Sequence, residues 1–359
     1  MLVGLLCPIG DTLFATPALA VLRRRFPRAH IDALVYRSNR GMLEGNPDID
    51  DYVLYDPTQA SHGLARFAHS VRQVRHARYD LMINLSAAAS LIGMLAGVGE
   101  QTHLDIPGPW WLTGTRDAAY RQRHAVEHYL RAIAPLLTTP TAVADRQPRV
   151  FLARQHRQAA RDLLRAAGLT SGTPLIALHA GGDGFRGRKR WSTRRFAAVG
   201  QHLVERYGAQ VLLLGGKEDI PLAEEVAARM PRGAHVLAGR TSLMETAALI
   251  ERAMLFIGND SCPLHIAAAL GVPAVGIYGP SSVAQFHPVG APGSRQRIVH
   301  ANLPCSPCFH FVGNDAPWAP NLCTSFACLK AISSEEVIAA AVELLRATSE
   351  DAAVARIGG

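Results

Sequence analysis

The chain has 359 residues, of which 48% are hydrophobic and 18% charged, and it carries a net charge of +8. This length is sufficient for two domains with separate cores, and the composition is that of a globular protein rather than a disordered or fibrous one. The positive charge is nearly all arginine and is scattered, without a basic tail or an aromatic-rich basic patch. We therefore expect an acidic partner and no nucleic acid binding.

The first residues are apolar but have no cationic stretch before them, so they do not resemble a signal peptide. The most membrane-like run, Leu81 to Val98, is interrupted by polar residues and glycines. It fits a strand followed by a buried helix better than a membrane span. We predict a cytoplasmic protein, and the reducing conditions there disfavour structural disulfides.

Strands and helices alternate along the first part of the chain. Apolar runs predict buried strands at residues 2–6, 31–35, 52–55 and 81–85, and helices at 13–26, 62–75 and 116–137. Asp11 falls in the loop between the first strand and the first long helix. This alternation predicts a doubly wound parallel sheet.

The pattern lapses near residues 138–148, continues with a helix at 157–167, and then starts again. Strands are predicted at 174–179, 210–214, 255–257 and 274–278, and helices at 192–207, 221–230, 243–251 and 265–270. We predict two Rossmann-like domains facing a central cleft, over residues 1–168 and 169–332. A C-terminal helix and tail, 333–359, is expected to pack back on the first domain.

Three polar sites follow directly after predicted strands, at Asp11, Gly181 and Asp260. Ligands of such sheets bind beyond the carboxyl ends of the strands. Ser261 is a good N-cap residue, and the start of the following helix would favour an anionic phosphate near Asp260 to His265. The alternative is an ordinary crossover with a polar loop.

Two residues have a catalytic and a structural interpretation. Asp11 is a general base at the cleft or a helix N-cap. Lys189, in the basic run from Arg186 to Arg190, neutralises phosphate charge or belongs to a solvated loop. Trp191 is a core residue rather than a stacking platform.

Further candidates follow later strands. Glu218 or Asp219, after a pair of glycines, could bind ribose hydroxyls or could simply begin a helix. His265 lies one turn from Asp260 and is interpreted as a phosphate donor.

Four cysteines cluster near the C-terminus, at Cys305, Cys308, Cys323 and Cys328. The first pair has the spacing of a metal knuckle, which fits structural zinc or iron. Free thiols or a disulfide are the alternatives. The chain has no G-x-G-x-x-G after its first strand and no P-loop motif, which argues against NAD oxidoreductases and P-loop enzymes.

Taken together, these motifs resemble glycosyltransferase family 9, the ADP-heptose:lipopolysaccharide heptosyltransferases. The resemblance is carried in order by residues 10–27, 180–192, 214–219 with 238–243, and 259–280. It implies a GT-B fold, with an N-terminal acceptor domain and a C-terminal donor domain. It also implies an inverting transfer that requires no cofactor.

The resemblance places roles on individual residues. The base falls on Asp11 and the phosphate lysine on Lys189, both counted as catalytic. The acceptor residues are Gly10 and Thr12. The donor-binding residues are Gly181, Lys189, Glu218, Asp219, Asp260, Ser261, Cys262 and His265. Cys262 departs from the family, which usually has glycine there, and the segment between Cys308 and Cys323 is longer than expected.

The implied partners are an ADP-sugar donor and a phosphorylated glycolipid, the lipopolysaccharide inner core, with peripheral contact at the inner membrane. Three alternatives remain: an adhesin-type protein acceptor, another GT-B enzyme such as a sugar-nucleotide epimerase, and a catalytically idle sugar-nucleotide binding module.

Overall fold

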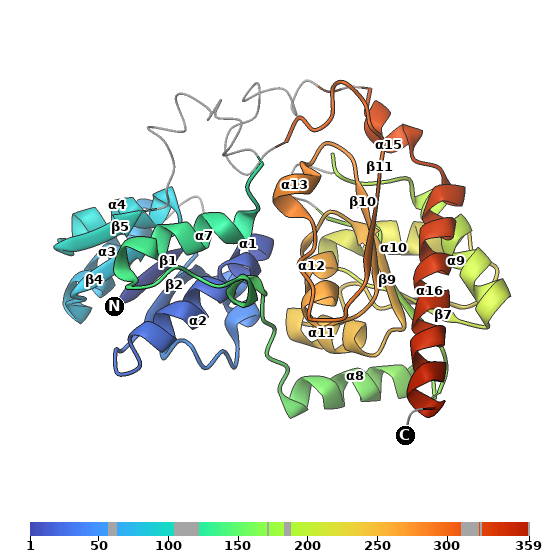
Figure 1. The fold of residues 1–359 in the computed structure, drawn as a ribbon, viewed down its shortest axis with the longest axis horizontal. Helices are drawn as coiled ribbons and strands as arrows, with labels where there is room; N and C mark the ends of the chain where they lie inside the picture. Colours follow the sequence, from blue (N-terminus) through green and yellow to red (C-terminus); the bar gives the residue numbers. More distant parts are fainter. Residues whose placement is uncertain are drawn as a thin grey trace. The chain divides into compact units, whose positions relative to one another are not determined.

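The computed structural model describes residues 1–56, 63–103, 122–170, 172–182, 188–309, 323 and 325–357. The chain divides into two compact units, Met1–Phe151 and Leu152–Gly359. Each is an α/β unit built on its own parallel sheet, so the predicted pair of doubly wound domains is confirmed (Figure 1). Arg186, and residues 310–322 of the long segment between Cys308 and Cys323, lie outside the described residues.

Unit 1 has a five-stranded sheet in the order β3-β2-β1-β4-β5. Every pairing in it is parallel, for example Val3 opposite Ala33 and Ile83. The strands are β1 (Leu2–Leu5), β2 (Asp32–Tyr36), β3 (Asp51–Tyr55), β4 (Leu81–Asn84) and β5 (Glu100–His103). The strand order reverses between β1 and β4, which is where ligands bind in such sheets.

The helices of unit 1 connect these strands. They are α1 (Ile9–Phe14), α2 (Thr16–Arg25), α3 (Gly63–Ala77), α4 (Ala87–Ala96) and α7 (Ala125–Ile133), with short 3-10 turns η1 (Arg37–Leu43), η3 (Ala134–Leu136) and η4 (Val143–Arg146). The single helix predicted at 13–26 is two helices, and Asp11 lies in the first of them rather than in a loop. The helix predicted at 116–137 lies partly outside the described residues.

Unit 2 has a six-stranded parallel sheet in the order β11-β10-β9-β6-β7-β8. Its strands are β6 (Leu175–His179), β7 (Gln210–Leu213), β8 (Ala234–Val236), β9 (Leu255–Asn259), β10 (Ala274–Tyr278) and β11 (Gln296–His300). Counted along the chain within this unit, that is the Rossmann order 3-2-1-4-5-6, and the order reverses between β6 and β9.

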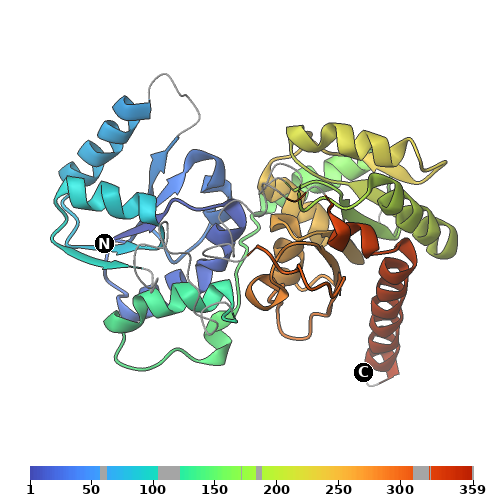
Figure 2. The same cartoon turned by 90° about the horizontal axis from the view of Figure 1, so that it is seen from above.

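The helices and 3-10 turn of unit 2 cover both faces of its sheet (Figure 2). They are α8 (Arg154–Ala166), α9 (Thr193–Tyr207), η5 (Lys217–Asp219), α10 (Ile220–Ala227), α11 (Leu243–Glu251), α12 (Cys262–Ala269), α13 (Val283–Phe286), α15 (Ala327–Ala331) and α16 (Ser334–Ile357). β8 and β11 were not predicted, because their residues are only partly buried and lack a continuous apolar run.

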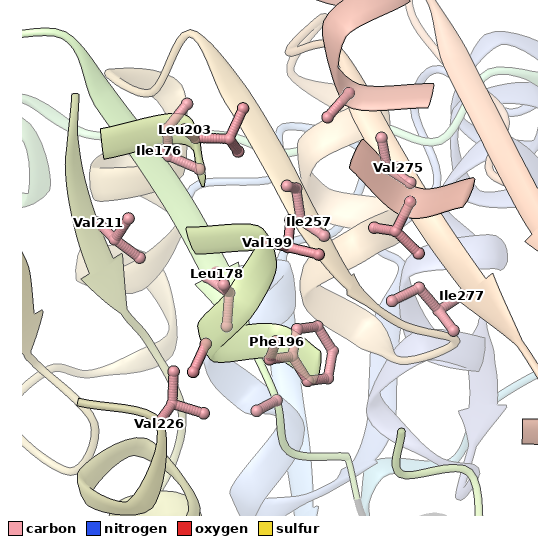
Figure 3. Packing of buried hydrophobic residues seen from close by; sticks show 14 of the residues in the cluster. Ile176, Leu178, Phe196, Val199, Leu203, Val211, Val226, Ile257, Val275 and Ile277 are labelled. Carbon is pink, nitrogen blue, oxygen red and sulfur yellow. The ribbon is translucent and has the colours of Figure 1, made fainter. Parts of the chain in front are cut away.

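Figure 3 shows the core beneath α9, where Phe196 and Val199 meet residues of β6, β9 and β10. These central strands are buried on both faces, and Ile257 and Val275 are fully covered. Burying one such aliphatic side chain contributes roughly 1.5–3 kcal/mol. Trp191 is also in this core, as predicted, and its indole N–H donates to the Ile332 carbonyl at 3.1 Å.

The ends of unit 2 differ from the sequence prediction. Helix α8 belongs to unit 2, not to the N-terminal domain, because it packs on α11 and Arg157 makes a two-pronged contact with Glu251 at 2.7 Å. Helix α16 was expected on the N-terminal domain. Instead, Val337, Ala341 and Leu344 lie in the core of unit 2, against β9–β11 and α9.

Candidate functional site

The first candidate region is the start of α1, directly after β1 in unit 1. Asp11 lies in the first turn of this helix and is half-buried. The fully buried Tyr129 hydroxyl hydrogen-bonds to Asp11 and Cys7, and burial together with the Asp11 charge raises the pKa of Tyr129 well above its usual value. A protonated phenol therefore lies against the Asp11 carboxylate.

The two predicted acceptor residues beside Asp11 differ in access. Gly10 is half-buried in the same turn. Thr12 is fully buried, and its hydroxyl donates to the Pro8 carbonyl at 3.3 Å and accepts from the Asn39 amide at 3.3 Å. The Thr12 hydroxyl therefore makes its hydrogen bonds within unit 1, at the start of α1.

The second region gathers around Asp260, which follows β9 in unit 2. Its side chain is 4% exposed. Lys189 Nζ lies 2.6 Å from Asp260 Oδ2, and His265 Nε2 lies 3.5 Å from Asp260 Oδ1. Burial opposes ionisation of Asp260, but the Lys189 charge and the His265 contact outweigh burial and hold its pKa well below the usual range. Asp260 is therefore a buried anion that holds two cationic or hydrogen-bonding groups together.

Ser261 occupies the N-cap position of α12, as predicted, but its side chain makes no capping hydrogen bond. Its hydroxyl instead donates to the Asn259 carbonyl at 3.2 Å and lies 3.1 Å from His179 Nδ1. Cys262 and Pro263 follow in the first turn, and Cys262 is buried. Pro263 has no N–H, and the Leu264 N–H donates to the Ser261 carbonyl at 3.0 Å, so an anion at this end of the helix would be favoured by the positive end of the helix dipole.

The two candidate ribose carboxylates are distinguished by burial. Glu218 is exposed, whereas the Asp219 side chain is 8% exposed and lies 3.3 Å from His179 Nε2. Burial opposes ionisation of Asp219, but His179 and the Gly216 N–H, at 3.0 Å, lower its pKa overall. Both contacts are made to Asp219 Oδ2, and Oδ1 is buried, so it is burial that separates Asp219 from the exposed Glu218.

Gly181 packs on the same carboxylate. A Cβ atom at this position would lie 2.0 Å from Asp219 Oδ1, so only glycine fits. The sequence prediction placed Gly181 among the donor-binding residues. In the structure, its lack of a side chain is required by packing against Asp219.

Two residues of this region were not predicted. His179 links Asp219 to Ser261, and Asn259 connects the two ends of the glycine-rich segment. The Asn259 amide donates to the Ala180 and Gly181 carbonyls at 2.9 and 2.8 Å, and its Oδ1 accepts from the Trp191 N–H at 3.0 Å. His179 and Asn259 are each a polar residue at the end of a buried strand, and this pattern could have identified them from the sequence.

The four clustered cysteines are free thiols in this structure. Burial, followed by the charges of the other three thiols, raises the pKa of Cys308, so the four lie in one region. Among the described residues, however, no three His, Cys, Asp or Glu side chains meet closely enough to hold a metal ion. The cysteines as placed here do not form the predicted tetrahedral site.

One cavity of unit 1 lies apart from the predicted site residues. This cavity, of about 460 Å³, is lined by Arg123, Arg131 and Arg146 among others, and by none of the predicted site residues. No helix of the described chain is long and apolar enough to cross a membrane.

The chain is similar to known proteins both in sequence and in fold. The family model for glycosyltransferase family 9 (heptosyltransferase) matches residues 66–318. Lipopolysaccharide heptosyltransferase 3 of Escherichia coli is 31% identical over 288 residues, covering 75% of this chain and 80% of that protein.

Two solved structures share the fold. A family 9 glycosyl transferase from Veillonella parvula superposes with a TM-score of 0.78 at 24% identity, covering 96% of both chains. The E. coli ADP-heptose lps heptosyltransferase II superposes with a TM-score of 0.75 at 22% identity, covering 97% of this chain and 99% of that one. The two parallel-sheet units are therefore of the GT-B type.

Proposed function

This chain belongs to glycosyltransferase family 9, and we propose that it transfers a heptose from ADP-heptose to the inner core of lipopolysaccharide. As a member of that family it is a glycosyltransferase. The proposal concerns the donor, the acceptor and the roles of the residues.

In the proposed reaction, Asp11 removes the proton from an acceptor hydroxyl. The acceptor oxygen then bonds to the anomeric carbon of the heptose, and the bond from that carbon to the diphosphate oxygen breaks with inversion. ADP leaves with the bonding electron pair. No cofactor takes part in these steps.

The observation that carries the proposal is the arrangement around Asp260. Lys189, His265 and the positive end of the α12 dipole place cationic and hydrogen-bonding groups at one end of the unit 2 sheet. Such groups stabilise the charge that develops on a departing diphosphate. We assign Asp260 the role of holding Lys189 and His265, because its carboxylate would repel the diphosphate if it met it directly.

The difference in burial supports Glu218 as the ribose ligand. Glu218 is exposed in the turn η5, which follows β7, and its carboxylate can accept hydrogen bonds from two hydroxyls. Asp219 keeps a supporting role through His179 and Gly216.

The donor is tested by titrating nucleotides and nucleotide sugars against the thermal unfolding midpoint. ADP-heptose and ADP should raise the midpoint by mass action more than UDP- or GDP-sugars do. A larger response to a UDP- or GDP-sugar would overturn the donor assignment.

The reaction is tested by incubating ADP-heptose with and without a heptose-deficient lipopolysaccharide. Transfer that requires this acceptor supports the proposal. Conversion of the donor without acceptor indicates an epimerase, and ADP binding without turnover indicates an idle binding module. Labelling of an adhesin-type protein, but not of the glycolipid, identifies a protein acceptor.

We also propose peripheral contact with the inner face of the cytoplasmic membrane, through α3 and α4 of unit 1. These helices pack side by side (Figure 2). α4 exposes Leu91, Met94 and Leu95, and Leu64 at the start of α3 is 88% exposed. The stretch from Gly63 to Tyr79 contains four arginines and no acidic residue. Exposed apolar side chains beside cationic ones suit an anionic lipid surface.

Flotation with phosphatidylglycerol-containing and pure phosphatidylcholine vesicles tests this surface. The chain should float with the anionic vesicles, and Met94→Ser should weaken the association. Val143→Ser is the matched control, because Val143 is 77% exposed and lies in η4, away from α3 and α4. Equal flotation of both variants would remove α4 from the proposal.

A structural zinc or iron at the four cysteines remains a prediction from the sequence. To bind a metal, the thiols would have to come closer than they lie in this structure. Elemental analysis of the purified protein checks it, and one metal ion per chain that is lost in Cys305→Ser is the expected result.

A further inference from the structure

The Lys189 ammonium lies against two aromatic rings as well as against Asp260. Its Nζ is 4.4 Å from the ring centroid of Phe309 and 5.4 Å from that of Phe286. The two rings stack on each other, with centroids 5.6 Å apart and planes at 15°. Lys189 is therefore fixed by a carboxylate at 2.6 Å and by a stacked aromatic pair.

Both rings are attached to the end of β10, the strand beside the one that carries Asp260. The Phe286 carbonyl accepts a hydrogen bond from the Tyr278 hydroxyl at 2.6 Å. Phe309 is held by its backbone, whose N–H donates to the Pro280 carbonyl at 2.8 Å and whose carbonyl accepts from the Ser282 N–H at 3.0 Å. The rings thus have fixed positions relative to the sheet.

The cysteine-containing segment is connected to Lys189 through Phe309. Cys308 also donates its backbone N–H to the Pro280 carbonyl at 2.9 Å, and the Ser306 hydroxyl donates to the Gly279 carbonyl at 2.7 Å. Segment 305–309 is therefore bound along the loop after β10. A displacement of this segment would carry the Phe309 ring away from Lys189.

A lysine ammonium sits on a flexible four-carbon stem with three rotatable donors. The contact with Asp260 fixes one direction of the ammonium, and the negative faces of the rings attract its positive charge from another. The rings also exclude water from one side of the ammonium, which strengthens its attraction to an incoming anion. Together these contacts preorganise a charge that would otherwise sample many rotamers.

We propose that Phe309, supported by Phe286, is a positioning residue that holds the Lys189 ammonium toward the diphosphate of the donor. The inference rests on the proposed function of Lys189. It gives the cysteine-containing segment a role in the reaction, because that segment supplies Phe309.

The test compares Phe309→Leu, which removes the aromatic face but keeps apolar bulk, with Phe309→Tyr, which keeps the ring. Phe309→Leu should lower kcat roughly tenfold, the size expected for a partly desolvated cation–aromatic contact, and Phe309→Tyr should recover most of the loss. Phe26→Leu is the matched control: Phe26 contacts a cation, Arg25, at 4.9 Å, but lies at the end of α2 in unit 1. Wild-type kcat in Phe309→Leu would overturn the inference.

A double-mutant cycle with Lys189→Met separates positioning from a general structural effect. If Phe309 acts through Lys189, Phe309→Leu should cause no further loss of kcat in the Lys189→Met background. The same tenfold loss in both backgrounds would contradict the inference. If Phe309→Leu fails to fold, Phe286→Leu takes its place in the cycle.

The cycle also distinguishes this inference from the proposed function. If Lys189→Met retains wild-type transfer, the role of Lys189 itself is wrong. If Lys189→Met loses activity and the Phe309 variants do not, only the aromatic positioning is wrong.

Discussion

Two aspartates follow buried strands next to the reversal of strand order, one in each unit, and their surroundings differ. Asp260 in unit 2 is buried against Lys189 and His265, which keep it ionised. Asp11 in unit 1 is half-buried, and a Tyr129 hydroxyl lies beside it. Comparable ends of two similar sheets thus hold a buried, ion-paired carboxylate in unit 2 and a half-buried carboxylate beside a phenol in unit 1. The proposed function assigns proton transfer to Asp11, because Asp260 is already paired with Lys189 and His265.

The largest expected effect is that of replacing Asp11, the half-buried carboxylate of unit 1. Asp11→Asn should lower kcat by roughly 10²–10⁴-fold, because the amide cannot act as a general base. ADP affinity, measured by calorimetry, should stay within about twofold, since the proposed diphosphate residues are all in unit 2. Asp51→Asn, an exposed change at the start of β3, is the control. Near-normal transfer by Asp11→Asn would show that Asp11 is not the general base.

The next largest effect is that of replacing Lys189, the ion-pair partner of the buried Asp260. Lys189→Met should lower kcat on the order of 100-fold, as loss of a transition-state charge donor does. It should also reduce the free energy of unfolding by about 3 kcal/mol, because it leaves the Asp260 carboxylate buried without its cation. Rates and urea unfolding measure the two effects. Loss of activity at unchanged stability would show that Asp260 does not depend on Lys189.

A smaller effect separates the two neighbouring acids of unit 2. Glu218→Gln should weaken ADP binding roughly tenfold with little loss of stability, as expected when an exposed ligand contact is removed. Asp219→Asn should instead cost about 1–3 kcal/mol of stability, because it disturbs a buried hydrogen-bonded carboxylate. Calorimetry with ADP and thermal unfolding decide between them. The reverse pattern would assign the ribose to Asp219.

The smallest effect is a pH dependence. The pKa of Asp260 is lowered in the folded state from its usual value of 3.8, so its stabilising contribution is fully present above that value. As the pH falls below 3.8 toward the lowered folded-state pKa, the unfolded chain binds a proton first and the contribution is lost. The stability difference between wild type and Lys189→Met should therefore shrink on acidification. A difference that stays constant down to pH 2 would contradict this account.

Several parts of the molecule could be predicted from the sequence because they depend on short-range patterns. Continuous apolar runs such as 255–257 and 274–278 gave the central strands, and helix signals placed α11 within its observed bounds. β8 and β11 were missed because partly exposed edge strands lack such runs. The placement of α16 was wrong because an amphipathic helix does not indicate which core it joins.

By itself, the sequence determined the alternation of strands and helices, the parallel sheets, and the polar residues at strand ends. It also supplied the motifs of glycosyltransferase family 9. These features follow from the periodicity of side chains and from residue types at fixed spacings. The tertiary structure alone decided how those polar residues are used, since burial and distance depend on segments far apart in the chain. In the folded chain, Asp219 contacts His179 and Thr12 accepts a hydrogen bond from Asn39. Lys189 contacts both Asp260 and the stacked rings of Phe286 and Phe309.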